Sequence, residues 1–349
     1  MAGVPDPEAL QREVADFQRR LAASAAALAR LSPLELATAA REAVWSEGKA
    51  TLYRYQSLAR PAGLPPLLIV FALVNRPTVL DLQPDRSLIR GLLAAGIDVY
   101  LLDWGTPDRG DRLLTLDDYV NGTLHRALTR LNAEHGPVNL LGVCQGGTLS
   151  VAYASLEPER IARLVTMVTP VDFHTPENLL AKWVRGVDID RLVDTYGNVP
   201  GEMLNFTFLA LMPFRLTLQK YLTLIDGAGD PEQLANFLRM EQWIFDSPDQ
   251  AGAAFREFVA AFFRDNRLAR GTLEIGARRV DPARLTMPIL NVYATLDHLV
   301  PPSASRPLAR LARSRAYEEL AFEGGHIGIY VSSRARTLPA TIAAWLGRD

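Results

Sequence analysis

The chain contains a single cysteine, Cys144, which lies in the segment Gly-Val-Cys-Gln-Gly-Gly. The pattern glycine–x–nucleophile–x–glycine is typical of a nucleophile elbow, a sharp turn in which a strand passes directly into a helix. Gly142 and Gly146 stand where side chains would clash in such a turn. The turn strains the backbone of its central residue and points the amino terminus of the helix at the sulfur, which favours a thiolate. A lone cysteine is otherwise a small buried apolar residue, so a catalytic role requires partners elsewhere in the chain.

Two such partners follow in the order nucleophile, acid, histidine, which is the order that enzymes with this elbow use. Asp297 comes just after a predicted late strand, and His326 follows the last predicted strand in a glycine-rich loop. We therefore predict that Asp297 orients the imidazole of His326, whose other nitrogen takes the thiol proton. His298 is an alternative base, but as the neighbour of Asp297 in an extended chain it would point the other way. We assign it a supporting role at most.

Acyl transfer at Cys144 also requires two N–H donors that stabilise the oxyanion of the tetrahedral intermediate. One donor is expected from Gln145, the residue after the nucleophile. The other is expected from the loop after the first buried strand, at Val74 or Asn75. Asn75 is also a candidate for supporting this loop, although an asparagine at a strand exit often only caps a turn.

The elements that must position these residues alternate between strands and helices. Residues 44–56 predict a first strand or hairpin. Apolar runs predict buried strands at residues 67–74, 97–103 and 138–143. Further strands are expected at residues 162–168, 288–294 and 317–322. Helical patterns occur at residues 87–95, 116–134, 146–156 and 334–346. Together with the elbow, this alternation predicts an α/β-hydrolase fold with a mostly parallel, doubly wound sheet.

The same patterns divide the chain into three parts. Residues 1–42 predict an N-terminal helical segment with a break at Ser32-Pro33. Residues 43–172 and 283–349 predict the α/β-hydrolase core. Residues 173–282 interrupt the sheet pattern and predict an inserted helical cap, or lid. The expected cap helices are at residues 206–211, 216–225, 234–245 and 253–263.

Composition excludes several other classes of protein. The formal net charge is −2 and charged residues make up 22% of the chain, so no basic excess exists to bind nucleic acid. The amino terminus has no apolar signal region, and the longest apolar run, at residues 64–74, is too short for a transmembrane span. We expect a soluble, cytoplasmic protein. With one cysteine and no ligand-type cluster of histidines or acids, we expect no metal, and no dinucleotide or P-loop motif occurs.

A cysteine nucleophile in place of serine favours acyl transfer over hydrolysis. If the substrate is a thioester, exchange onto sulfur is nearly isoenergetic, and the bound acyl group keeps the free energy needed to form an oxygen ester. An apolar cap that excludes water would favour the same outcome. Its aromatic residues include Trp183, Phe206, Phe208, Phe214, Trp243, Phe245 and Phe255. The alternatives are a cysteine hydrolase of esters or lactones, and a non-catalytic scaffold of the same fold, which the intact set of three residues disfavours.

Several segments together resemble polyhydroxyalkanoate synthases. Cys144 lies in GVCQGG, Asp297 in LDHLVPP and His326 in EGGHIGIY. The other similar segments are ALVNRPTVLDL, VYLLDWG, LVTMVTPVDF and FLRMEQWIFDSPDQAG. The similarity runs from about residue 43 to the end of the chain. Because the long N-terminal domain of the class I and II enzymes is lacking, the chain looks like a class III catalytic subunit. Class IV subunits are also short and remain an alternative.

The resemblance implies the polymerisation of (R)-3-hydroxyacyl-CoA, with 3-hydroxybutyryl-CoA as the expected monomer, into polyester with release of CoA. It implies that Cys144 carries the growing chain and that His326 activates the thiol. Whether His326 or Asp297 activates the substrate hydroxyl is left open. It further implies a second, non-catalytic subunit, a homodimer and a location at the surface of polyester granules. No cofactor is expected, because the CoA thioester is the substrate and CoA is the product.

Overall fold

The computed structural model describes residues 7–28, 34–227 and 230–348. Within these ranges the main sheet has eight strands in the order β1-β2-β6-β3-β7-β8-β11-β12. β2 is antiparallel to both β1 and β6, and the other neighbours are parallel. The strands are β1 (Arg41–Glu47), β2 (Ala50–Tyr55), β3 (Leu67–Val70), β6 (Val99–Asp103), β7 (Val138–Val143), β8 (Ile161–Met167), β11 (Ile289–Ala294) and β12 (Tyr317–Phe322). The predicted hairpin and the mostly parallel sheet are both confirmed.

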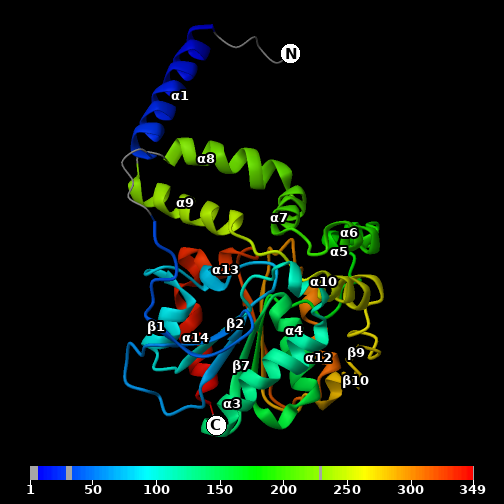
Figure 1. The fold of residues 1–349 in the computed structure, drawn as a ribbon. Coiled ribbons are helices and arrows are strands. Elements are labelled where there is room, and N and C mark those ends of the chain that lie inside the picture. Colours follow the sequence, from blue (N-terminus) through cyan, green and yellow to red (C-terminus); the bar gives the residue numbers. More distant parts are fainter. Residues whose placement is uncertain (1–6, 29–33, 228–229, 349) are drawn as a thin grey trace.

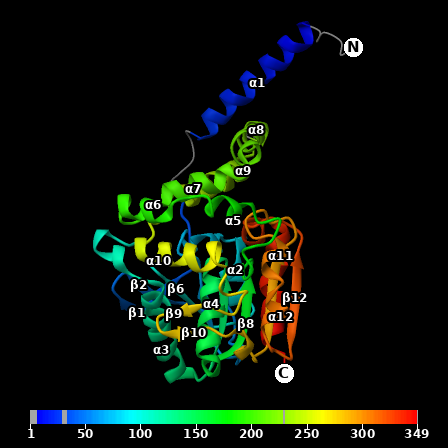
Figure 2. The same ribbon diagram turned by 90° about the vertical axis from the view of Figure 1, so that its right-hand side faces the viewer.

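Helices cover both faces of this sheet, as Figures 1 and 2 show. α2 (Leu88–Ala94) and α14 (Leu338–Leu346) pack together over one face, while α3 (His125–His135) and α4 (Gln145–Leu156) cover the other. The apolar side chains therefore form two cores, one on each side of the sheet. β3 and β7 are buried along their whole length, which is why their sequences read as continuous apolar runs.

Between β8 and β11 the chain leaves the sheet and forms a group of helices. They are α5 (Leu179–Val184), α6 (Ile189–Tyr196), α7 (Gly201–Ala210), α8 (Lys220–Gly227), α9 (Pro231–Phe245) and α10 (Gly252–Phe258). Figures 1 and 2 show α7, α8 and α9 gathered at one end of the sheet, with α1 (Pro7–Leu28) in contact with α8 and projecting beyond it. Helices α5 to α10, which we call the cap helices, lie within the predicted insertion 173–282. Its limits remain a prediction. In the part of the chain that the structure describes, no helix combines the length and apolarity needed to cross a bilayer.

The N-terminal segment differs from its prediction. Helix α1 ends at Leu28 and β1 begins at Arg41, so the predicted helix does not extend to residue 42. The amide of Ala37 donates to the Asp81 carbonyl at 2.9 Å, and that of Ala39 to the Asp81 carboxylate at 2.7 Å. These tertiary hydrogen bonds replace helical ones, so the local helix propensity is overridden. The predicted break at Ser32-Pro33 lies outside the described residues.

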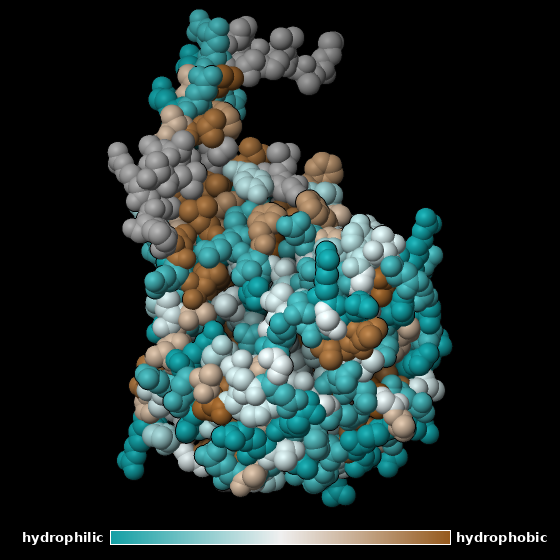
Figure 3. Space-filling model, in the orientation of Figure 1, coloured by the Kyte–Doolittle hydropathy of each residue, from teal (hydrophilic) through white to brown (hydrophobic). Residues whose placement is uncertain are grey.

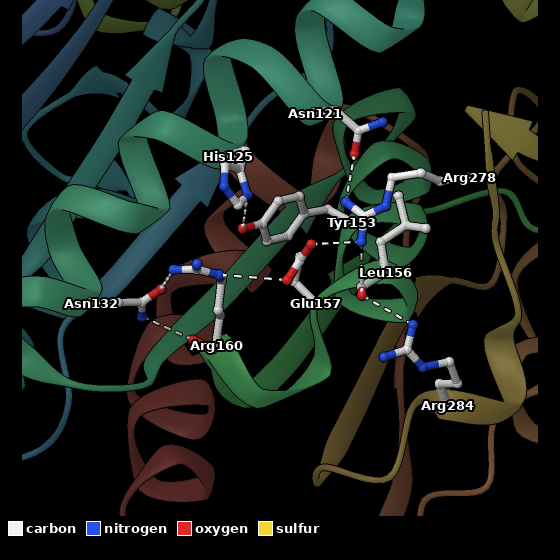
Figure 4. A network of polar contacts seen from close by, with 9 residues as sticks. All are labelled: Asn121, His125, Asn132, Tyr153, Leu156, Glu157, Arg160, Arg278 and Arg284. Carbon is white, nitrogen blue, oxygen red and sulfur yellow. Dashed lines mark hydrogen bonds and ion pairs between the residues drawn. The ribbon is translucent and has the colours of Figure 1, made fainter. Parts of the chain in front are cut away.

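A polar network surrounds the C-terminal end of α4, as Figure 4 shows. Glu157 pairs with Arg278 at 2.6 Å and with Arg160 at 3.7 Å. The Tyr153 hydroxyl lies 3.2 Å from Nδ1 of His125. Arg278 belongs to a short strand that follows the cap helices, so the network fastens the returning chain to the core. His125 is half-buried and hydrogen-bonded within this network.

Candidate active site

Cys144 occupies the sharp turn between β7 and α4 that the sequence predicts. Its backbone has φ of 53° and ψ of −124°, a conformation that non-glycine residues rarely adopt. The Cys144 amide donates to the Met167 carbonyl at 2.9 Å, which holds the turn against β8. Because Cys144 is the N-cap residue of α4, its side chain lies at the positive end of the helix dipole. This strained position is the one expected of a nucleophile.

The two flanking glycines are required by close packing. A Cβ on Gly146 would lie 2.4 Å from the carbonyl oxygens of Val70 and Phe71. A Cβ on Gly142 would lie 2.6 Å from the Ser150 hydroxyl. Both distances are too short for real contacts, so the predicted clashes at these positions are confirmed. The same packing brings the start of α4 against the end of β3, where the second oxyanion donor was expected.

Asp297 and His326 form a buried pair. Nδ1 of His326 lies 2.7 Å from Oδ2 of Asp297, and the side chains are 7% and 0% exposed. The other carboxylate oxygen, Oδ1, accepts the amides of Leu299 and Val300, both at 2.9 Å. The turn after β11 therefore fixes the carboxylate. Because Asp297 bonds Nδ1 of the imidazole, Nε2 is on the side of the ring that faces away from Asp297.

The charges around His326 favour its protonated form. Burial is the largest single influence and disfavours the charged ring, but Asp297 and Cys144 together outweigh it. The net result is a pKa of His326 well above the ordinary value of 6.5, and a hydrogen bond to the Cys144 side chain contributes to it. A protonated ring in turn favours negative charge on the neighbouring sulfur. The arrangement brings a thiol, an imidazole and a carboxylate together at one site.

The loop after β3 forms the opposite side of the site. The apolar run at residues 67–74 does not continue as a strand, because β3 ends at Val70. The Leu73 amide donates to the Gln145 side-chain oxygen at 3.0 Å, so the residue after the nucleophile holds this loop. Asn75 is held by Ser247, which follows α9: the Ser247 hydroxyl donates a hydrogen bond to Oδ1 of Asn75 at 2.5 Å. Val74, Asn75 and Gln145 all reach the same cavity as Cys144.

That cavity, the acyl cavity, encloses about 140 Å³ between the sheet and the cap helices. Cys144 and His326 line it from the core, and its remaining surface is mainly apolar. Residues from the cap helices that line it include Leu180, Val184, Leu204, Phe208, Trp243, Phe255 and Phe258. The cavity therefore offers a mainly apolar surface with the Cys144 thiol at one wall.

Two other histidines lie near the site without joining it. His298 does not line the acyl cavity, so of the two candidate bases it is His326 that meets both the acid and the thiol. His174, at the start of the predicted cap, bonds through Nε2 to the Phe263 carbonyl at 2.9 Å and ties the chain leaving β8 to the cap helices. Among the described residues, no group of three or more His, Cys, Asp or Glu side chains can hold a metal ion.

Sequence reasoning missed two features of the site. The Gln145 side chain, expected to matter only through its backbone, is the acceptor that fixes the loop after β3. Tyr330, four residues after His326, also lines the acyl cavity. Nothing in its spacing marked it, because its place depends on how α13 (Gly328–Val331) folds back onto the sheet.

A catalytic elbow, a buried acid–histidine pair and a doubly wound sheet together define an enzyme of the α/β-hydrolase class. A family profile for the alpha/beta hydrolase fold matches residues 65–333. Solved structures agree on the fold. A hydrolase from Pseudomonas aeruginosa PA01 has 17% identity and a TM-score of 0.56, over 90% of this chain and 100% of that one. An esterase from Thermogutta terrifontis has 18% identity and a TM-score of 0.54, over 89% and 98%.

Sequence relatives identify the family within that class. The chain is 53% identical to the poly(3-hydroxyalkanoate) polymerase subunit PhaC of Allochromatium vinosum, over 97% of both chains. It is 51% identical to the PhaC subunit of Thiocystis violacea, again over 97% of both, and 50% identical to that of Synechocystis sp. over 88% and 84%. The chain therefore belongs to the poly(3-hydroxyalkanoate) polymerase PhaC family. The resemblance to polyhydroxyalkanoate synthases is confirmed, and the matching lengths agree with a short, class III type of subunit.

Proposed function

We propose that this chain polymerises (R)-3-hydroxyacyl-CoA into polyester and releases CoA, with the growing chain held on Cys144 as a thioester. The observation that carries the proposal is that Cys144 and His326 meet at the wall of an apolar cavity, with Asp297 bonded behind the histidine. The polymerase names of relatives at 50% identity and above support the same activity.

In the first step, the Cys144 sulfur attacks the carbonyl carbon of the acyl-CoA. The carbon–sulfur bond to CoA breaks, and the CoA thiolate takes the proton that His326 carries. We assign stabilisation of the negative oxygen of the tetrahedral intermediate to hydrogen bonds from the backbone N–H groups of Gln145 and Val74, two residues that line the same cavity as Cys144. Thioester exchange costs little free energy, so the acyl group stays activated on the enzyme.

In the second step, the 3-hydroxyl of an incoming monomer attacks the Cys144 thioester. A carbon–oxygen bond forms, the carbon–sulfur bond to Cys144 breaks, and the hydroxyl proton passes to His326. We assign this base role to His326 and orientation of the ring to Asp297, because Oδ2 of Asp297 is already bonded to Nδ1. The lengthened chain, which now ends in a CoA thioester, then acylates Cys144 again and releases CoA.

The size of the acyl cavity supports a short monomer. An apolar protein cavity of about 150 Å³ accommodates a ring of six carbon atoms. A 3-hydroxybutyryl group has the same number of heavy atoms, and the cavity here encloses about 140 Å³. We therefore propose 3-hydroxybutyryl-CoA as the preferred substrate, with no cofactor required.

The deciding experiment measures CoA release and polymer from 3-hydroxybutyryl-CoA. Cys144→Ala and His326→Gln should abolish both, whereas His298→Gln should retain most of the wild-type rate. Retained turnover in Cys144→Ala would refute the nucleophile assignment. Release of free 3-hydroxybutyrate without polymer by the wild-type protein would support the rival hydrolase instead.

We further propose that the chain works as a homodimer with a second, non-catalytic subunit, at the surface of polyester granules in the cytoplasm. The supporting observation is a set of exposed apolar side chains on or beside the cap helices. They are Phe206, Phe214, Tyr221, Leu222 and Phe245. Figure 3 shows apolar groups gathered over the part of the molecule where Figure 1 draws α8 and α9.

Three measurements test this assembly. The purified chain alone should show low activity that a co-expressed partner subunit raises. Sedimentation of the chain should give the mass of a dimer, and a fluorescent fusion should collect on granules in polymer-forming cells. A fully active monomer that stays diffuse in such cells would contradict all three parts of the proposal.

A further inference from the structure

Tyr330 has a buried hydroxyl that stands out because none of the described residues hydrogen-bonds to it. The residue is 3% exposed, and its hydroxyl oxygen is one of the buried polar atoms without a partner among the described residues. It lies in α13, four residues after His326, and it lines the acyl cavity together with Cys144 and His326. The mechanism described above leaves this group without a role.

An unpaired buried hydroxyl lowers the stability of the folded protein. A buried hydroxyl that loses its hydrogen bonds to water without gaining others destabilises the fold, and phenylalanine would fill the same space without that penalty. Native proteins satisfy most buried polar atoms, so an unsatisfied one beside a substrate cavity points to a partner that arrives with the substrate.

The hydroxyl is suited to donate a hydrogen bond. Burial, followed by the charges of Cys144 and Asp297, raises the pKa of Tyr330 well above its ordinary value. The phenol therefore stays protonated throughout the neutral range. The ring lines the same cavity as the Cys144 thiol and the His326 imidazole.

The position of Tyr330 indicates the step of the reaction in which its hydroxyl takes part. Val74 and Gln145 are the residues to which we assign the oxyanion contacts, whereas Tyr330 lies in α13, which begins two residues after His326. The group that meets the base during elongation is the 3-hydroxyl of the incoming monomer. Its hydrogen is directed at the imidazole, one lone pair attacks the thioester, and a second lone pair is free to accept a hydrogen bond.

We propose that the Tyr330 hydroxyl donates a hydrogen bond to the 3-hydroxyl oxygen of the incoming monomer and aligns it between His326 and the Cys144 thioester. This inference rests on the proposed polymerase function. It makes Tyr330 a substrate-contacting residue for elongation that the acylation step does not use. Alignment of a nucleophile of this kind raises the rate because the reacting atoms are held within bonding distance.

The test separates the two steps with two substrates. Butyryl-CoA acylates Cys144 but brings no 3-hydroxyl, so it reports acylation alone as a single release of CoA per active site. With 3-hydroxybutyryl-CoA, steady-state CoA release reports elongation as well. Tyr330→Phe should acylate from butyryl-CoA within twofold of the wild-type rate, while steady-state kcat falls about 3- to 10-fold, as expected for one lost hydrogen bond.

The matched control is Tyr153→Phe, which removes a buried hydroxyl that bonds His125 away from the cavity (Figure 4). This variant should keep both rates. Tyr330→Phe should also melt at or above the wild-type temperature, because it removes an unpaired polar atom. Wild-type elongation in Tyr330→Phe, an equal loss in both reactions, or a clearly lower melting temperature would each overturn the inference. If the wild-type protein itself releases no CoA from either substrate, the proposed function fails first.

Discussion

The side-chain oxygen of Gln145 accepts the Leu73 amide at 3.0 Å and so joins the turn at Cys144 to the loop after β3. Gln145 and Val74, the two residues to which we assign the oxyanion contacts, both line the acyl cavity. The nucleophile turn and the loop after β3 are therefore positioned by one residue. A change in either one is transmitted to the other.

Replacing this side chain should impair catalysis without unfolding the protein. Gln145→Ala keeps the backbone donor but frees the loop, and displacement of a catalytic group by about 1 Å can cost about 10²-fold in rate. We expect kcat to fall about 10- to 100-fold and the Leu73 amide to lose protection against hydrogen exchange. Normal protection of Leu73 in the variant would show that the loop is held by other contacts.

Removing the acid should change both the rate and its pH dependence. Asp297 raises the pKa of His326, so Asp297→Asn should lower it, and the ring then loses its proton at a lower pH. The sulfur loses the positive charge beside it, and alkylation of Cys144 by iodoacetamide should shift to higher pH. Polymerisation should fall about 10²- to 10⁴-fold, the usual contribution of a positioned acid–base group.

A matched control for this variant is Asp194→Asn, which removes a carboxylate that pairs with Arg256 on the surface. This change should leave the alkylation profile of Cys144 where it is in the wild-type protein. An unshifted profile in Asp297→Asn would mean that the charge on Asp297 does not govern the state of the pair.

The sequence predicted that Cys144, Asp297 and His326 would lie together because each sits at a point that local rules define. Cys144 lies in a turn whose glycines are needed by packing, and Asp297 and His326 each follow a parallel strand of the main sheet. The carboxyl ends of parallel strands meet at one edge of a sheet, so residues distant in the chain had to converge there.

The features that were predicted wrongly or not at all depend on tertiary contacts, which no local sequence pattern contains. The apolar residues 71–74 look like a strand, yet β3 ends at Val70 because the start of α4 packs against it at Gly146. The predicted N-terminal helix fails near Ala37 because Asp81, far along the chain, takes its amide hydrogen bond. The role of Tyr330 depends on an unpaired atom, which only coordinates reveal.

Enlarging the acyl cavity should relax the preference for short monomers. Phe255 on α10 lines the cavity, so Phe255→Ala should admit a longer acyl chain where the ring stood. We expect the wild-type kcat/KM for 3-hydroxybutyryl-CoA to exceed that for 3-hydroxyoctanoyl-CoA by at least about 10-fold, and this ratio to narrow several-fold in the variant. An unchanged ratio would mean that selection occurs outside the cavity. The exposed Tyr196→Ala is a matched control, since Tyr196 does not line the cavity.

The network at the end of α4 should make stability depend on pH through Glu157. Burial opposes its charge, but the hydrogen bond from Arg278 prevails and lowers the pKa of Glu157. A carboxyl whose pKa is lower in the folded state adds stability above its unfolded pKa, and this contribution is lost as pH falls through the folded value. Glu157→Gln should therefore reduce the free energy of unfolding by about 1–2 kcal/mol at pH 7 and by less at pH 3.5. Urea unfolding at the two pH values measures the difference, with the exposed Glu42→Gln as control. A deficit that stays constant between them would show that Glu157 contributes through packing and not through its charge.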